Sequence, residues 1–211
     1  MFLSPTTESQ GHGKPWERDI LVPLGVSEEL QKEYSHTDIY DGRKEHTSTH
    51  RNISIKTTKT MSLDCGDIIR FLTCSELDII VIHYSQKMKK MKKAMKTYLI
   101  DHDKLIQKLK TDIPLIYDIT FEEWIDKIKE YDKRVKAIPH GKCNDKSYKS
   151  EKALLCKDIP YFNIAPKVDS KKQRRVQCSI NLNKIVINET YDGGKFRDIT
   201  YMKEIISEPR K

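Results

Sequence analysis

The clearest alternation of apolar and polar residues lies in NISIKT, residues 52–57. Ile53 and Ile55 share one face of this segment. Ser54 and Lys56 share the opposite face, and the resulting period of two predicts a half-buried strand. One face of the strand is therefore expected to pack in a core, while the other carries polar side chains.

Other segments predict further strands and a turn. LDIIVIHY, residues 77–84, is almost continuous in apolar residues, which is typical of a strand buried on both faces. Residues 167–188 contain a second alternating pattern, and we expect one or two strands there. Asp41 and Gly42 stand between two β-prone runs, and this pair predicts a hairpin turn.

Helical periodicity is clear in four segments. Ser27 and Ser62 are placed to cap the first two helices, and Thr120 with Glu123 predicts a capping box at the last. In the third helix, methionines repeat along one face and are expected to lie in the core. The predicted helices span residues 26–34, 62–74, 86–110 and 120–138.

The remaining segments are polar and irregular. Residues 1–19 predict a loose N-terminal arm, and residues 139–160 predict an irregular loop region. A chain of 211 residues is long enough for one sizeable core, so we expect a single domain over residues 1–211. The strands and helices together predict an α/β fold in which helices flank a central mixed β-sheet.

Composition narrows the classes of partner. Lysine and arginine number 39 against 31 acidic residues, a net charge of +8, which favours a polyanionic partner. No run of roughly eighteen apolar residues occurs, and the N-terminal segment lacks an apolar stretch after a basic region. We therefore expect no membrane span and no secretory signal, and a cytoplasmic location. The five cysteines lack zinc-ligand spacing.

A carboxylate beside the NISIKT strand would suit a particular chemistry. Metal-dependent phosphodiester hydrolysis uses carboxylates to hold Mg²⁺ against the phosphate, and a lysine to stabilise charge and orient the attacking water. Ser54 and Lys56 would face the substrate while Ile55 packs in the core. Asp38 lies in the β-prone run that precedes the Asp41-Gly42 turn and is the preferred acid. Asp41 is already explained by the turn and is the alternative.

These residues resemble the PD-(D/E)xK nuclease superfamily, and in size and layout the chain is similar to type II restriction endonucleases. The resemblance covers residues 27–85, roughly, and its motif is short. It implies a Mg²⁺-dependent, sequence-specific endonuclease that cuts double-stranded DNA as a homodimer within a restriction-modification system. The acidic position of (D/E)xK is Ser54 here, so one carboxylate is missing from its usual place.

The missing carboxylate has one candidate replacement in the following helix, and Glu29 and Glu33 on the first predicted helix are a further candidate acid pair. Some restriction enzymes with a serine at this position take the acid from the following helix, which implies Asp67, since Asp64 is explained as a partner of the helix dipole. An early helix in the family often brings a glutamate to the metal, which implies Glu33. An exposed acid on a solvated helix face is the alternative explanation of both residues.

Contacts to DNA are expected in SKKQRRVQ, residues 170–177, because arginine and glutamine make bidentate hydrogen bonds to base edges. Gln86, after the buried strand, is a further candidate. Two other hypotheses remain open: a structure-selective or repair nuclease with the same fold, and a non-catalytic basic protein that binds nucleic acid. The candidate contacts within residues 170–177 are Lys172, Arg174, Arg175 and Gln177.

Overall fold

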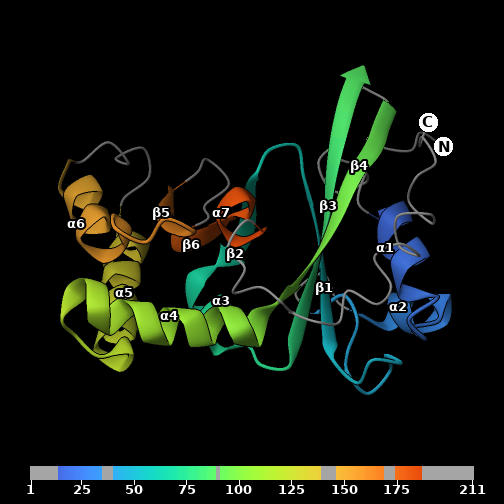
Figure 1. Ribbon diagram of the computed structural model, residues 1–211, viewed down its shortest axis with the longest axis horizontal. Helices are drawn as coiled ribbons and strands as arrows, with labels where there is room; N and C mark the ends of the chain where they lie inside the picture. Colours follow the sequence, from blue (N-terminus) through green and yellow to red (C-terminus); the bar gives the residue numbers. More distant parts are fainter. Residues whose placement is uncertain (1–13, 35–39, 89–90, 139–145, 169–173, 187–211) are drawn as a thin grey trace. The chain divides into compact units, whose positions relative to one another are not determined.

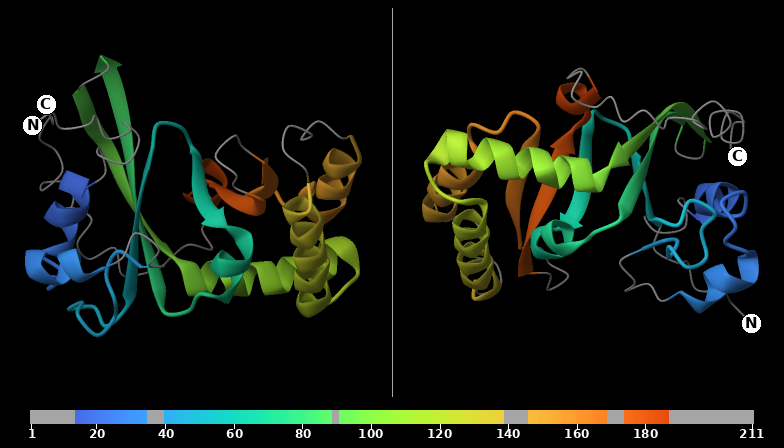
Figure 2. Two further views of the ribbon diagram at one scale, coloured as in Figure 1. Left: turned by 180° about the vertical axis from the view of Figure 1, so that it is seen from behind. Right: turned by 60° about the horizontal axis from the view of Figure 1, so that its bottom comes forward.

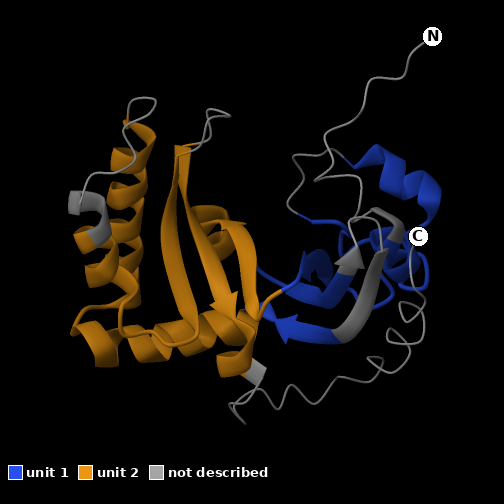
Figure 3. Ribbon diagram, turned by 90° about the horizontal axis from the view of Figure 1, so that it is seen from above, with its two compact units in different colours: residues 1–59, 75–102, 193–211 blue, residues 60–74, 103–192 orange. Residues whose placement is uncertain are grey.

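A computed structural model describes residues 14–34, 40–88, 91–138, 146–168 and 174–186. In these ranges the chain is mixed α/β, as expected (Figure 1). Its strands form two three-stranded sheets instead of one central sheet, and each sheet belongs to its own compact unit (Figure 3). The single domain over the whole chain stays a prediction. Unit 1 comprises residues 1–59, 75–102 and 193–211, and unit 2 comprises residues 60–74 and 103–192.

Unit 1 contains the mixed sheet, with the strand order β1-β3-β4. β1 (Asn52–Thr58) runs parallel to β3 (Leu77–Met88), so both predicted strands are confirmed. β3 pairs with β4 (Met91–Asp101) in a long antiparallel hairpin (Figure 1). β3 is thus the central strand, and its residues 79–82 are all buried, as a strand covered on both faces requires.

β4 occupies part of the predicted helix 86–110, which is therefore wrong over the strand. Strand pairing decides between the two structures. Leu99 lies opposite Ile80 of β3. As a strand, β4 supplies cross-strand partners along the edge of β3 that β1 does not occupy. Helical structure begins only at α4 (His102–Tyr117). The spacing of methionines and lysines favours a helix here, but pairing with the second edge of β3 makes the segment a strand.

Two helices lie on one side of the unit 1 sheet (Figures 1 and 2). α1 (Lys14–Leu21) buries Trp16 and Ile20, which are one turn apart, so residues 14–19 are helical and not part of a loose arm. α2 (Glu28–Glu33) has the predicted N-cap, since Ser27 Oγ accepts a hydrogen bond from Leu30 N at 3.3 Å. The shared core consists of Trp16, Ile20, Leu21, Val26, Ile53, Ile55, Ile80 and Ile82.

Unit 2 contains an antiparallel sheet with the order β2-β6-β5. β6 (Arg174–Asn181) confirms a strand within residues 167–188, and β5 (Phe162–Val168) is its neighbour. β2 (Ser62–Asp67) lies where a helix was predicted, because it pairs with β6 along its length. The helix itself is shorter: α3 (Ile68–Thr73) begins after Asp67, which is its N-cap in place of Ser62.

α5 (Phe121–Lys136) confirms the fourth predicted helix. The capping box is formed as expected: Glu123 N donates to Thr120 Oγ1 at 3.1 Å, and Thr120 N donates to Glu123 Oε2 at 2.7 Å. Trp124 is fully buried, and its ring meets that of Phe162 in β5 edge-on, with the centroids 6.2 Å apart. α5 is thereby fixed to the sheet of its own unit.

The segment expected to be irregular, residues 139–160, contains α6 (Lys146–Cys156), so that expectation is wrong for these residues. Residues 139–145 lie outside the described ranges. α6 is tied to α5 because Trp124 Nε1 donates to Leu155 O at 2.8 Å. α7 (Leu182–Val186) directly follows β6. None of the helices in the described ranges is long and apolar enough to cross a membrane.

Candidate functional site

The candidate site lies in unit 1, where the chain ahead of β1 returns to that strand. Asp41 N and Gly42 N both donate to Ile53 O, at 2.8 and 3.1 Å. Ile53 N donates to Gly42 O at 2.7 Å, which completes an antiparallel bridge. Asp41 therefore lies beside the start of Ser54-Ile55-Lys56. It is not the turn residue that the sequence suggested, because the chain reverses later, within residues 43–51.

The Asp41 carboxylate is fixed against β1. Its Oδ2 accepts a hydrogen bond of 2.6 Å from Ile55 N and a longer one, 3.4 Å, from Ser54 Oγ. β1 is an edge strand, so some of its N–H groups point away from β3, and Asp41 satisfies one of them. The bond to Ile55 N is charge-assisted, which holds the carboxylate in one orientation. Oδ1 accepts no hydrogen bond from the residues that the structure describes.

Lys56 projects from the same strand face as Ser54, since Ile53 and Ile55 belong to the core on the opposite face. Ser54 is only 4% exposed, whereas Lys56 is partly exposed. Within the described ranges, no carboxylate forms an ion pair with Lys56. Ser54 and Lys56 therefore share the predicted face, but burial does not alternate as expected, because Ser54 is as buried as Ile55.

A cluster of rings beside Asp41 was not indicated by any sequence pattern. Tyr34 Oη and His46 Nδ1 lie 2.8 Å apart, and the two rings stack with their centroids at 6.2 Å. The Arg43 guanidinium lies over the Tyr34 ring, 5.1 Å from its centroid. The cluster joins the end of α2 to the loop that follows Asp41, and so restrains the chain that carries this carboxylate. The pairing depends on the path of the loop, which residue spacing does not encode.

The oxygen donors at this site suit Mg²⁺ in kind. The Asp41 carboxylate and the Ser54 hydroxyl are hard ligands, and Mg²⁺ commonly uses only one or two carboxylates together with water and substrate phosphates. Asp38, the preferred acid, lies outside the described residues, and Glu33 is the exposed last residue of α2. The described part of the chain contains no group of three His, Cys, Asp or Glu side chains that could hold a metal ion.

Asp67 belongs to unit 2, where local structure explains its carboxylate. Oδ1 of Asp67 accepts a hydrogen bond from Arg70 N at 3.0 Å, which caps α3. Asp64 was expected at a helix start but lies in β2 instead: its Oδ1 accepts from Gly66 N at 2.8 Å, where the register between β2 and β6 shifts. The expectation that Asp67 supplies the metal-binding carboxylate that is missing at Ser54 stays a prediction.

The residues expected to contact DNA fall in both units. Gln86 lies on β3 of unit 1. In unit 2, Arg174 supports the fold, because its Nε donates to Ile138 O, just after α5, at 3.0 Å. Arg175 and Gln177 are partly exposed residues of β6, and Lys172 lies outside the described residues.

Comparisons with protein-family models, with curated proteins and with solved structures found no match for this chain. The resemblance to PD-(D/E)xK nucleases therefore rests on its own residues: an acid, a serine and a lysine on neighbouring backbone segments. Any activity assigned to the site is a proposal argued from these residues.

Proposed function

We propose that this protein is a Mg²⁺-dependent endonuclease that hydrolyses phosphodiester bonds of double-stranded DNA, in the manner of a type II restriction enzyme. The observation that carries the proposal is the contact of the Asp41 carboxylate with the backbone of Ser54-Ile55-Lys56, at 2.6 Å from Ile55 N. An acid bound to the strand that presents Lys56 supplies one of the carboxylates and the lysine that this chemistry uses.

Each residue has a distinct part in the proposed reaction. Lys56 supplies positive charge beside the scissile phosphate, where negative charge increases in the transition state, and it orients the attacking water. The Asp41 carboxylate, held by Ile55 N, would bind Mg²⁺ through the oxygen that it does not share with the strand. Bound there, Mg²⁺ would polarise the phosphate and lower the pKa of a coordinated water. Ser54 adds a neutral oxygen donor, so the second negative charge must come from another acid, and Asp38 and Asp67 are the candidates.

Sequence specificity and dimerisation are further parts of the same proposal. A homodimer reads a palindromic site because its two-fold axis matches that of the DNA. The excess of basic over acidic residues, 39 against 31, favours DNA as the partner. A cytoplasmic location follows from this role, since the substrate would be intracellular DNA.

The direct test is cleavage of mixed-sequence plasmid and phage DNA by the purified protein, with Mg²⁺ and with EDTA. We expect discrete fragments in Mg²⁺ and none in EDTA. Lys56→Ala should lower the rate by about 10²- to 10³-fold, the usual loss when one group that stabilises transition-state charge is removed. Lys59→Ala is the matched control, because it removes the same charge from an exposed position just after β1.

The outcomes separate the competing functions. Cleavage of junctions or ends without discrete fragments from linear duplexes would favour a structure-selective or repair nuclease. Binding without cleavage under every metal condition would contradict an enzyme and favour a non-catalytic nucleic-acid-binding protein. Full activity of Lys56→Ala would contradict the role of Lys56 even if the protein cuts DNA.

A further inference from the structure

The sheet of unit 2 has two unlike faces. Val176, Cys178 and Ile180 of β6 are buried, whereas the residues that alternate with them are partly exposed. Directly paired residues of neighbouring strands project from the same face, so the polar face continues across the sheet. Asn163 of β5 is paired with Ser179 of β6, and Ser62 of β2 is paired with Asn181 of β6.

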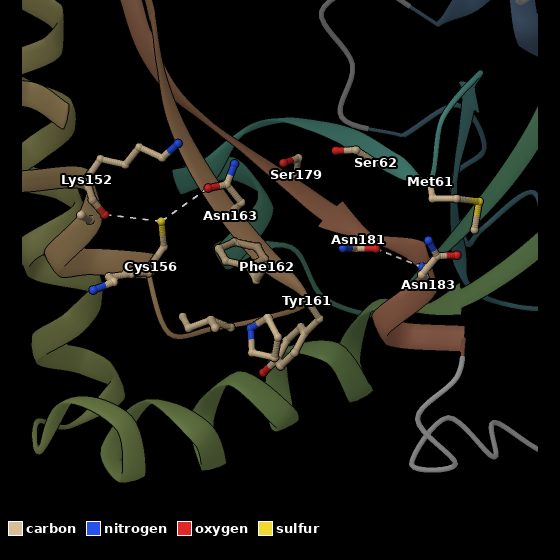
Figure 4. A pocket seen from close by; sticks show the side chains of 14 residues that line it. Met61, Ser62, Lys152, Cys156, Tyr161, Phe162, Asn163, Ser179, Asn181 and Asn183 are labelled. Carbon is tan, nitrogen blue, oxygen red and sulfur yellow. Dashed lines mark hydrogen bonds between the residues drawn. The ribbon is translucent and has the colours of Figure 1, made fainter. Parts of the chain in front are cut away.

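A cavity of about 810 Å³ lies at this polar face, lined by α6 and by all three strands (Figure 4). Its volume is within the range of small-ligand sites, about 300 to 1,000 Å³. Two lysines, Lys152 and Lys157, contribute to the lining, and no carboxylate does so among the described residues. The lining also contains the Cys156 thiol and Tyr161, together with hydroxyl and carboxamide side chains of serines and asparagines: Ser62, Asn163, Ser179, Asn181 and Asn183.

The two central asparagines present hydrogen-bond donors to the cavity. Asn163 Oδ1 accepts from Cys156 Sγ at 3.6 Å, and Asn181 Oδ1 accepts from Asn183 N at 3.1 Å (Figure 4). Each carboxamide oxygen is thereby occupied, while neither NH₂ group has a partner among the described residues. The cavity therefore offers unpaired amide donors, and each of these two carboxamide oxygens has one of its two lone pairs engaged.

Lys152 adds positive charge to this set of donors. It extends from α6 toward the strand that carries Asn163 (Figure 4), and no described carboxylate forms an ion pair with it. Burial raises the pKa of the Cys156 thiol, and a backbone hydrogen bond at Ile164 and then the positive charge of Lys152 lower it in part. Lys152 is thus an unneutralised cation at a site rich in donors.

These features select one chemical class of ligand. A metal cation would find no carboxylate in the lining, and a neutral ligand would leave the lysines unused. A phosphate group would accept from the amides, the hydroxyls and the ammonium together. The volume exceeds that of a bare phosphate, and Met61 and Pro160 supply apolar surface for a sugar or base. We propose that this cavity binds a nucleotide through its phosphate, either as a free nucleotide or as one unit of a nucleic-acid strand.

The test measures binding to the full-length protein by fluorescence anisotropy, with a short fluorescein-labelled single-stranded DNA as the probe and free dAMP as the competitor. EDTA is present throughout, so cleavage does not interfere. Asn163→Asp replaces the NH₂ donor with a carboxylate oxygen and keeps an acceptor for Cys156. Lys152→Gln removes the cation. Each should weaken binding about tenfold, as expected for the loss of one charge-assisted hydrogen bond.

Two controls carry the same changes of charge elsewhere in unit 2. Gln107→Glu on α4 matches Asn163→Asp, and Lys127→Gln on α5 matches Lys152→Gln; both positions are exposed and neither lines the cavity. We expect each control to change affinity less than twofold. Equal losses in the controls and the cavity variants, or no loss in Asn163→Asp, would overturn the proposal, as would the absence of binding by the unaltered protein.

The competitor identifies the source of the nucleotide. Displacement of the probe by dAMP at concentrations that saturate the cavity supports a site for free nucleotides, whereas displacement only by unlabelled strand supports a site for one unit of a strand. The result is independent of the nuclease proposal. If Asn163→Asp weakens binding and the protein never cuts DNA, the nucleotide site is supported and the nuclease proposal is contradicted. If the protein cuts DNA and Asn163→Asp leaves binding unchanged, the nuclease proposal is supported and the nucleotide site is contradicted.

Discussion

Asp132 offers the sharpest test of how unit 2 is held together. It is an acid on α5 that is only 3% exposed. Its Oδ1 accepts a hydrogen bond of 2.7 Å from Val176 N of β6, and Lys136 lies one helical turn away at 2.5 Å from Oδ2. This carboxylate therefore joins α5 to β6, the central strand of the unit 2 sheet.

The expected cost of Asp132→Ala follows from these contacts. A buried N–H left without an acceptor costs about 1 to 3 kcal/mol. The ion pair adds little, because the Lys136 side chain is 55% exposed and such pairs contribute about 0 to 1 kcal/mol. Together these terms lower the free energy of unfolding by about 1 to 4 kcal/mol. Asp132→Asn keeps an oxygen for Val176 N and should lose less than half as much.

Urea denaturation followed by tryptophan fluorescence measures this loss in the relevant unit. The chain has two tryptophans, and Trp16 lies in unit 1 while Trp124 lies in unit 2. In a Trp16→Phe background, fluorescence therefore reports on unit 2 alone. A loss below about 0.5 kcal/mol for Asp132→Ala, or an Asn variant as unstable as the Ala variant, would refute the reasoning that Val176 N depends on this acceptor.

Two further predictions concern local ion pairs and caps. Arg51 donates from Nε to Asp78 at 2.8 Å, and the Asp78 side chain is 14% exposed. Arg51→Met should therefore destabilise unit 1 by about 1 to 3 kcal/mol. Urea denaturation in a Trp124→Phe background, read at Trp16, measures this loss, and an unchanged midpoint would contradict the prediction. The pKa of Glu123 is lowered, first by the hydrogen bond from Thr120 N, so its stabilising effect is present above its ordinary pKa of 4.5 and is lost as the pH falls below that value. Glu123→Gln should therefore be less stable than the unaltered protein at pH 7, and a difference that persists undiminished near pH 3 would refute this account of the cap.

The elements that sequence patterns located correctly are those whose determinants are local. α5 carries its own capping box and a repeating apolar face, and α2 carries its own N-cap. In β1, alternation alone placed Ile55 in the core and Lys56 on the opposite face. Such signals lie within a few residues of one another, so no knowledge of distant partners is needed to interpret them.

The elements that were wrong depend on distant partners. Residues 91–101 and 62–67 each carry enough helical periodicity to predict a helix, yet each is a strand because another strand is available to pair with it. The same limit applies to the site. The sequence favours Asp38 and offers Asp41 only as the alternative acid, because Asp41 also fits a turn. Its hydrogen bond to Ile55 N does not follow from spacing, because the bond requires the loop between them to fold back. Pairing is a property of the whole chain, whereas propensity is a property of the segment.

The central claim is that the carboxylate bound to β1 takes part in DNA hydrolysis, and Asp41→Asn tests it most directly. The substitution removes the negative charge and keeps an oxygen that can accept from Ile55 N, so the strand should remain intact. The measurement is the rate of plasmid cleavage by the variant and the unaltered protein across a series of Mg²⁺ concentrations, with circular dichroism to confirm an unchanged fold. We predict that Asp41→Asn loses cleavage at every Mg²⁺ concentration. A folded Asp41→Asn protein that cuts DNA at the unaltered rate would contradict the claim.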